Sequence, residues 1–162
     1  MEPKAELLPL PPVYGKPRTT MAWGPVRSRL EEAPHYWVAT TRPDGRPHVV
    51  PLDGVWVDDA WFGGGAPETV RHRNLEHNPQ AAVHLPDPLQ AVVVEGRCEL
   101  VRDPSPQLRR RLFEASQKYA AMGYAPHDLE SYDPSGMWML RPRRAVAWAS
   151  YPTDATRFTW DP

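Results

Sequence analysis

Short apolar runs alternate with tight-turn signals along the chain, and this pattern constrains the fold more than any other feature. Residues 35–41 ("HYWVATT") and 47–57 ("PHVVPLDGVWV") are rich in aromatic and β-branched side chains, which favour strands. Asp44-Gly45 lies between these runs and is a strong hairpin signal. A two-residue turn there would place His48 opposite Thr41. The first half of the chain is therefore predicted to form antiparallel strands.

Further runs of the same kind continue this pattern. A second hairpin is predicted through Asp58-Asp59, where "VDDAWFGG" turns back on itself. Gly96 falls inside a long apolar run and indicates a bulge or bend. Arg141-Pro142 is expected to separate the last two strands, because proline cannot donate to a strand ladder. The additional predicted strands are residues 80–85, 90–101, 137–142 and 143–150.

Three segments are predicted to be helical instead. Pro25 can begin a helix because proline is tolerated in the first turn, and a second helix is expected at residues 67–77, ended by Asn78-Pro79. Residues 104–122 give the clearest helix. Its apolar face consists of Leu108, Leu112, Ala115 and Tyr119. So few helices exclude repeated strand–helix–strand units, and we predict a mainly β fold, a small antiparallel split barrel with flanking helices.

Length and composition limit the domain organisation and the class of partner. The chain has 162 residues, which fits one domain; residues 1–24 are proline-rich and are predicted to be an extended arm, and residues 25–162 the domain. A formal net charge of −1 provides no basic field for nucleic acid. No apolar run approaches the ~20 residues of a membrane span, and no signal peptide is evident. A cytoplasmic protein is therefore expected.

The stretch from Gly63 to Pro79, "GGGAPETVRHRNLEHNP", places three glycines directly before a short basic helix. The unpaired N–H groups of a helix N-terminus attract anions, and glycines let a ligand approach the backbone closely. Thr69 could add a hydroxyl, and Arg71 could bind phosphate oxygens with its planar guanidinium. The alternative is a solvent-exposed helix with a charged stripe made of Glu68, His72 and Glu76. Spacing alone leaves both interpretations open.

Patterns for catalysis or metal binding are sparse. His72 and His77 are five residues apart and do not share a helix face, and no HExxH or His-Cys cluster is present, so no metal site is predicted. The single cysteine, Cys98, excludes an internal disulfide and is expected to be a buried apolar group. No catalytic residue is assigned. Tyr124 or Tyr132, in the loop after the long helix, could donate a proton, but no pattern selects either one.

The order of these elements resembles the flavin and deazaflavin oxidoreductases with the split β-barrel fold, the superfamily of pyridoxamine 5′-phosphate oxidase. The resemblance covers about residues 30–160 and rests on "ATTRPDGRPHVVP", on the "RNL…NP" helix and on "VVVEGRCELV". "RPRRAVAW" and "DATRF" add to it. It implies a homodimer with FMN or coenzyme F420, a deazaflavin, bound at the subunit interface. Some branches of the superfamily bind haem-related ligands instead.

The resemblance also implies a cofactor site. Thr69, Val70 and Arg71 match the Ser-Arg-Lys of pyridoxamine oxidases, whose basic residues hold the FMN phosphate, so Val70 leaves one cationic contact missing. The segment from His48 to Leu52 would follow the ring. The glycines would allow close approach to it, whereas His72 and Arg73 are expected on the solvated side of the helix. The expected cofactor-binding set is His48, Val49, Val50, Pro51, Leu52, Gly64, Gly65, Thr69, Val70, Arg71, Asn74 and, reaching the partner's site, Arg157 and Trp160.

The pyridoxal-binding pattern of true pyridoxamine oxidases is not evident near the C-terminus, which argues against vitamin B6 oxidation. "RHRNL" is instead similar to the F420-binding branch of the superfamily. We therefore predict a reductase that uses F420H2 to transfer a hydride to an electron-poor small organic substrate. The alternatives are an FMN-dependent oxidase or reductase on the same fold, and a non-catalytic flavin or haem-related binding protein.

Overall fold

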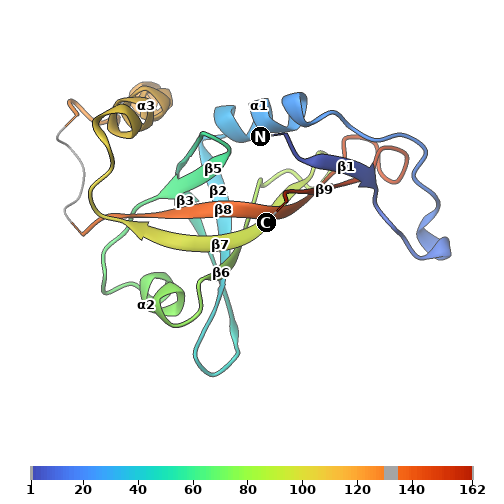
Figure 1. The fold of residues 1–162 in the computed structure, drawn as a ribbon, viewed down its shortest axis with the longest axis horizontal. Helices are drawn as coiled ribbons and strands as arrows, with labels where there is room; N and C mark the ends of the chain where they lie inside the picture. The colour runs from blue at the N-terminus through green and yellow to red at the C-terminus, as the bar shows by residue number, and fades with distance from the viewer. Residues whose placement is uncertain (1, 130–134, 162) are drawn as a thin grey trace.

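The computed structural model describes residues 2–129 and 135–161. In this part of the chain, nine strands form one curled sheet, and three α-helices lie around it (Figure 1). The elements are β1 (Lys4–Leu7), η1 (Pro12–Tyr14), α1 (Trp23–Glu32), β2 (His35–Thr41), β3 (Pro47–Asp53), β4 (Val55–Val57), β5 (Ala60–Gly63), α2 (Val70–His77), β6 (Gln80–His84), β7 (Val92–Val101), α3 (Pro106–Ser116), η2 (Gln117–Met122), β8 (Met137–Ala147) and β9 (Thr156–Thr159).

The main path of the sheet runs in the order β1-β9-β8-β7-β6-β2-β3. The hairpin of β4 and β5 joins this path through β5, which pairs with β8. Every strand pairing among the described residues is antiparallel. The predicted mainly β, antiparallel architecture is therefore confirmed.

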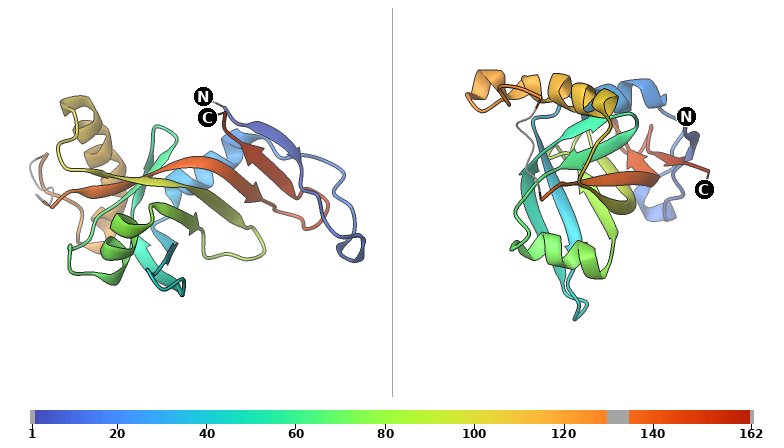
Figure 2. Two further views of the ribbon diagram at one scale, coloured as in Figure 1. Left: turned by 60° about the horizontal axis from the view of Figure 1, so that its bottom comes forward. Right: turned by 60° about the vertical axis from the view of Figure 1, so that its left-hand side comes forward.

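The helices cover two ends of the sheet. α1 and α3 lie over one end, and α2 lies near the other end beside the tip of the β2–β3 hairpin (Figures 1 and 2). Trp23 and Leu30 of α1 enter the main core inside the sheet. The apolar face predicted for residues 104–122 is confirmed, because Leu112 and Tyr119 form a second core with the β4–β5 hairpin. These contacts hold the two helices at the end of the sheet opposite α2.

The β2–β3 hairpin forms as predicted, but its turn is longer. The amide N–H of Arg42 donates to the carbonyl of Arg46 at 2.9 Å, and Gly45 has a φ of +85°. These features are typical of a three-residue hairpin loop with glycine in the left-handed region. His48 consequently lies opposite Thr40. The predicted partner of His48 was wrong by one position, because a two-residue turn was assumed.

Two other glycine and aspartate signals are confirmed. Val57 pairs with Ala60, and the intervening Asp58 and Asp59 have φ values of 55° and 56°, as a tight two-residue hairpin requires. The register of β7 against β8 shifts between Glu95 and Gly96, which is the predicted bulge. A Cβ on Gly96 would lie 2.1 Å from the carbonyl oxygen of Arg141, so only glycine fits there.

The predicted break at Arg141-Pro142 was wrong, because β8 runs unbroken from Met137 to Ala147. On the side opposite β7, β5 pairs with residues 138–140 and β9 pairs with residues 144–147. Neither β5 nor β9 pairs with residues 141–143. Pro142 therefore lies where this side of β8 has no strand partner. A proline is tolerated where no ladder needs its N–H group.

The ends of the elements also differ from the prediction. α1 begins at Trp23 rather than Pro25, and α2 begins at Val70 rather than at residue 67. Residues 4–7, within the predicted arm, form the edge strand β1, which pairs with β9 near the C-terminus. Neither strand was predicted, because each has only four residues and the two pair with each other from opposite ends of the sequence.

Candidate cofactor site

The glycine stretch connects β5 to α2, and its three glycines have different environments. A Cβ on Gly63 would lie 2.2 Å from the Trp61 ring. Gly65 has a φ of +135°, and a Cβ there would lie 2.3 Å from the guanidinium of Arg71. Gly64 is exposed, and no atom lies within 4 Å of its would-be Cβ. Two of the glycines are therefore required by packing, whereas Gly64 faces open space.

Arg71 lies beneath this stretch rather than on the surface. Its side chain is 2 % exposed, and its Nη2 donates to the carbonyl oxygen of Gly64. Its Nη1 is buried and has no hydrogen-bond partner among the described residues. Burial lowers the pKa of Arg71. The guanidinium thus supports the backbone of the glycine stretch and retains unused hydrogen-bonding capacity.

His72 is also buried, which corrects the expectation that it lies on the solvated side of the helix. Its ring is 3 % exposed, and its Nδ1 lies 3.2 Å from Nε1 of Trp138, which donates to it. Its Nε2 lies 3.6 Å from Oε1 of Glu76. Arg73 is exposed as expected. The charged stripe proposed as the alternative interpretation is therefore interrupted at His72, which joins α2 to β8.

A hydrogen-bonded series connects α2 to the strands β2 and β3. The side-chain amide of Asn74, which is buried, donates to Oγ1 of Thr40 at 3.0 Å. Oγ1 of Thr40 lies 3.4 Å from Nδ1 of His48 on β3. The register of the hairpin makes this series possible, because Thr40 and His48 face each other. Asn74 therefore positions the imidazole of His48 through Thr40.

Positive charge gathers around His48. Burial lowers the pKa of His48, and the charges of Arg42 and Arg71 lower it further. Arg42 forms no ion pair with any residue in the described ranges, although the nearby Arg46 pairs with Asp44 at 2.8 Å. The turn end of the hairpin and the start of α2 together make a small electropositive region. Arg42 was not predicted as a site residue, because the pairing of the hairpin had to be known first.

β3 is an edge strand, and its free edge is unusual. In an antiparallel pair of strands, facing residues alternate between pairs that exchange backbone hydrogen bonds and pairs that do not. Arg42 and Arg46 are hydrogen-bonded, so Thr40 and His48 are the next hydrogen-bonded pair, and every second pair after that follows. The backbone groups of Pro47, Val49 and Pro51 therefore point away from β2, toward the open edge. Because proline has no N–H group, Val49 supplies the one backbone donor of this three-position stretch.

Other predicted residues of β3 and α2 take less direct positions. Val50 and Leu52 are half-buried on the inner side of β3, and Val49 and Pro51 are exposed. Thr69 is the N-cap of α2: its Oγ1 accepts from the N–H of His72 at 3.3 Å and donates to the carbonyl of Ala66 at 2.9 Å. The Thr69 hydroxyl thus stabilises the helix start. Val70 is the first helical residue and is half-buried.

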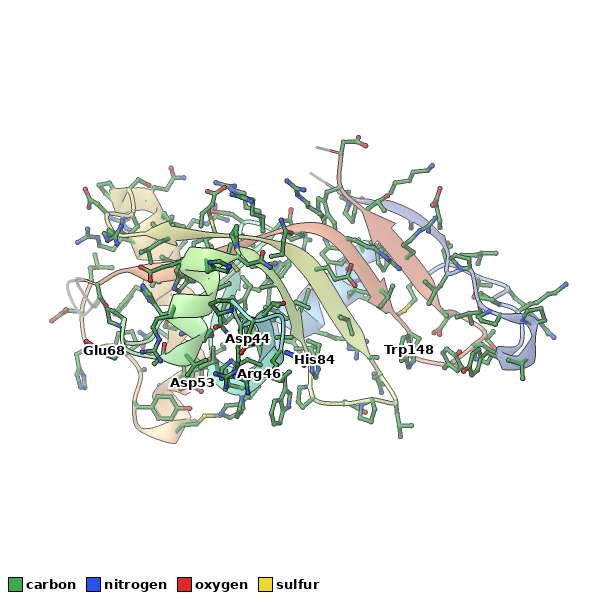
Figure 3. All side chains as sticks on the ribbon, turned by 90° about the horizontal axis from the view of Figure 1, so that it is seen from below. Asp44, Arg46, Asp53, Glu68, His84 and Trp148 are labelled. Atoms are coloured by element: carbon green, nitrogen blue, oxygen red, sulfur yellow. The ribbon has the colours of Figure 1, made fainter. Side chains whose placement is uncertain are left out.

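Arg157 and Trp160 do not join these residues within one protomer. Arg157 on β9 forms an ion pair with Glu6 of β1 at 2.7 Å, and the Trp160 ring packs edge-on against Trp23 at 4.9 Å. β9 lies toward the opposite edge of the sheet from β3. Figure 3 shows Trp148, in the segment between β8 and β9, well apart from the other labelled residues. The expected contact of Arg157 and Trp160 with a partner's site stays a prediction.

A further cluster lies at the far end of β3. Nε2 of His35 and the hydroxyl of Tyr124 each lie 3.5 Å from Oδ1 of Asp53. The Tyr119 ring stacks on Tyr124 at 5.2 Å. The Tyr119 hydroxyl lies 2.7 Å from the carbonyl oxygens of Pro34 and Gly54, and it donates its single hydrogen to one of them. The structure thus places Tyr124 beside β3; Tyr132, the other proton donor considered, lies outside the described residues.

Two features of other chemistry are plain. Cys98 is buried, and burial raises the pKa of its thiol to about 12, as expected for a small apolar group. Among residues 2–129 and 135–161, no group of three His, Cys, Asp or Glu side chains is arranged to hold a metal ion. Over the same ranges, no helix combines the length and apolar character needed to cross a membrane.

The antiparallel curled sheet, with its helices at the ends and an open-edged strand beside a glycine-led helix, has the architecture of a split β-barrel. A family model described as pyridoxamine 5′-phosphate oxidase matches residues 24–149. The chain belongs to this family. The resemblance stated from the sequence is thereby confirmed at the level of family and fold.

Solved structures agree with this assignment. The chain is similar to a heme binding protein from Mycobacterium smegmatis, with 22% identity, a TM-score of 0.63 and coverage of 82% of this chain and 55% of that one. It is also similar to an F420 reductase, with 24% identity, a TM-score of 0.54 and coverage of 73% of this chain and 94% of that one. A third similar structure is an FAD-binding protein from Mesorhizobium loti, with 18% identity, a TM-score of 0.59 and coverage of 87% of this chain and 96% of that one. A search of curated protein sequences finds no match. At these identities the structures show the shared fold alone.

Proposed function

We propose that the chain binds coenzyme F420 along the open edge of β3 and is a reductase of electron-poor small organic substrates. The observation that carries this proposal is the edge itself. Val49 presents an N–H and a C=O side by side, between two prolines that have no N–H to donate to another strand there. Such an edge favours a single planar ligand over the strand-by-strand pairing that other exposed edges invite.

The hydrogen-bonding pattern of the edge suits a flavin-type ring. The pyrimidine part of a flavin or deazaflavin carries a ring N–H beside carbonyl groups, which complements one backbone C=O and one backbone N–H. Gly64 adds an exposed backbone position without a side chain. Together with the half-buried side chains of His48 and Val50, these groups would hold and orient the ring and limit the access of water. The cofactor, when bound, supplies the hydride chemistry.

The electropositive region around His48 suits the phosphate of the same cofactor. Arg42 has no carboxylate partner in the described part of the chain, and Arg71 carries an unused buried Nη1. Phosphate oxygens are acceptors that guanidinium groups bind strongly. Val70 leaves one cationic contact of the pyridoxamine oxidases missing from α2. We infer that Arg42, on the hairpin, provides the second positive charge instead.

Titration of the purified protein with F420, FMN and riboflavin, followed by fluorescence, tests this proposal. Val49→Pro removes the outward N–H without touching the bonds to β2, and Val49→Ala is the matched control. Loss of one hydrogen bond predicts that Val49→Pro weakens ring binding by about 2–10-fold, whereas Val49→Ala changes it little. Equal affinities for both variants, with unchanged circular dichroism, would contradict the placement of the ring.

The phosphate contact has its own matched pair. Arg42→Gln is expected to weaken FMN and F420 by about 10-fold or more and to leave riboflavin unaffected, since riboflavin has no phosphate. Arg46→Gln, on the same hairpin, removes a charge already paired with Asp44 and is expected to leave all three affinities alone. Absence of F420 and FMN binding at micromolar concentration would contradict the proposed reductase function. A Soret band with added haem would favour a haem-binding protein instead.

We also propose that the chain forms a homodimer through the outer face of β2, β3 and β6. Trp37 and Val49 are exposed there, at 38 % and 49 %, and Trp37 stacks on His84 at 6.4 Å. Exposed apolar patches of this kind mark contact surfaces. The small side chains of Ala39 and Ala82 lie in a hollow of about 410 Å³ beside them. Light scattering coupled to gel filtration is expected to give twice the mass of one chain; a monomer at micromolar concentration would contradict the proposal.

A further inference from the structure

A separate cavity of about 340 Å³ lies between the end of α1 and the connection from β6 to β7. Its volume is within the range of small-molecule sites. Ala33, Pro34, Leu85 and Pro86 give it an apolar wall. Its polar lining residues are Arg29, Glu32, His35, Asp87 and Gln90. An apolar wall with a few polar groups is the usual composition of a site for a small organic ligand.

Arg29 is the strong cation of this cavity, and its charge is not neutralised by a close partner. It belongs to none of the ion pairs found in residues 2–129 and 135–161, and its Nη1 is buried without a hydrogen-bond acceptor in those ranges. Burial lowers the pKa of Arg29, whereas the more distant charges of Asp87 and Asp154 oppose this effect. Because no carboxylate in the described ranges lies within ion-pair distance of this guanidinium, a ligand that supplies one to its accessible part is favoured.

The nearby carboxylates are occupied elsewhere. Oδ1 of Asp87 accepts from the backbone N–H of Leu89 at 2.8 Å, and the Asp154 carboxylate accepts from two backbone N–H groups at 2.8–3.1 Å. Each therefore stabilises its own loop rather than pairing with Arg29. Their charges, with that of Glu32 on the cavity wall, still disfavour a ligand with several negative charges.

His35 connects the cavity to the cofactor edge. It is the first residue of β2 and lies opposite Asp53, the last residue of β3. Its Nε2 is 3.5 Å from Oδ1 of Asp53, so the imidazole stands between the cavity and the end of the strand proposed to carry the ring. His35 thus borders both the cavity and the end of β3 that lies away from the hairpin turn.

We propose that this cavity binds the substrate, and that the substrate is a small apolar molecule with a single carboxylate, bound by Arg29. Ala33, Pro34 and Leu85 contact the apolar body, and the carboxylate gives the guanidinium the ion-pair partner that it lacks. The assignment of the occupant as substrate rests on the proposed reductase function; the binding of a carboxylate does not. The cavity is thus a specificity site for that same reaction.

Calorimetric titration of the full chain with benzoate, and with benzamide as the neutral isostere, tests the site. Benzoate is expected to bind at least 10-fold more tightly than benzamide. Arg29→Gln should abolish that difference, and Arg29→Lys should keep part of it, because the charge remains but the planar fork is lost. Arg27→Gln is the matched control on the same helix, since Arg27 already pairs with Glu31.

The outcomes separate this inference from the proposed function. Equal binding of benzoate and benzamide by the unaltered protein overturns the carboxylate site, and this comparison needs no variant to fold. Unchanged preference in Arg29→Gln, or equal loss in Arg27→Gln, also overturns it. Failure to bind F420 and FMN, with the benzoate preference intact, overturns the reductase and leaves the site standing. Cofactor binding without a preference for benzoate overturns the carboxylate site and leaves the proposed reductase function standing.

Discussion

Replacing Gly65 by alanine should destabilise the protein far more than the same change at the adjacent Gly64. Gly65 has a φ of +135°, a conformation that costs other residues about 1–3 kcal/mol. Its new Cβ would also lie 2.3 Å from the guanidinium of Arg71, which must move and give up its bond to the Gly64 carbonyl. A hydrogen bond to a charged group contributes about 1.5–3 kcal/mol. We therefore expect Gly65→Ala to lower the free energy of unfolding by about 3 kcal/mol or more.

Urea unfolding followed by tryptophan fluorescence measures this loss, and about 6–12 °C should be lost in melting temperature for a chain of this size. Gly64→Ala is the matched control, because a Cβ there meets no atom within 4 Å; its stability should change by less than about 0.5 kcal/mol. Cofactor titration should show a reduced affinity in Gly64→Ala although its stability is unchanged. Equal stability of Gly65→Ala and the unaltered protein would refute the role given to Arg71.

Three further changes have defined outcomes. Asn74→Ala leaves the buried Thr40 hydroxyl without its donor, and should cost about 1–3 kcal/mol by chemical denaturation. Trp138→Phe removes the donor to His72, and should lower the melting temperature by several degrees in a thermal scan. Burial lowers the pKa of Lys118 from 10.5 to about 8. Between these pH values the unfolded chain therefore binds more protons than the folded chain, and the free energy of unfolding rises with pH. Urea midpoints measured over this range should rise with pH in the unaltered protein relative to Lys118→Met.

Local signals predicted the parts of the fold that local chemistry determines. Asp58-Asp59 formed its tight hairpin, and Gly96 formed a bulge where a side chain would strike the facing strand. Both depend on backbone conformations or contacts that few residues allow. Asp44-Gly45 was a less complete signal, because glycine in the left-handed region suits both two- and three-residue loops. The one-residue error changed the partner of His48 and concealed its contact with Thr40.

Features that depend on distant neighbours were not predictable in the same way. Pro142 does not interrupt β8, because β5 and β9 pair with the residues on either side of it. His72 is buried because Trp138, far along the chain, covers α2 and donates to its ring. Six of the eight residues of α2 are polar or charged, so no periodicity in this helix identifies which of them another strand will cover. The cluster of His35, Asp53 and Tyr124 likewise needs three separate elements.

The three glycines at the start of α2 now have separable roles, and this separation bears on the cofactor. Packing against Trp61 and Arg71 accounts for Gly63 and Gly65, so their presence gives no independent support for a ligand. Gly64 is exposed and has no such structural reason, and its own carbonyl oxygen accepts a hydrogen bond from Arg71. Support for a phosphate-bearing cofactor therefore comes from Gly64 and from the positive charges around His48, and not from the glycine run as a motif. A cofactor-binding loss in Gly64→Ala without a stability loss would be the direct sign of that role.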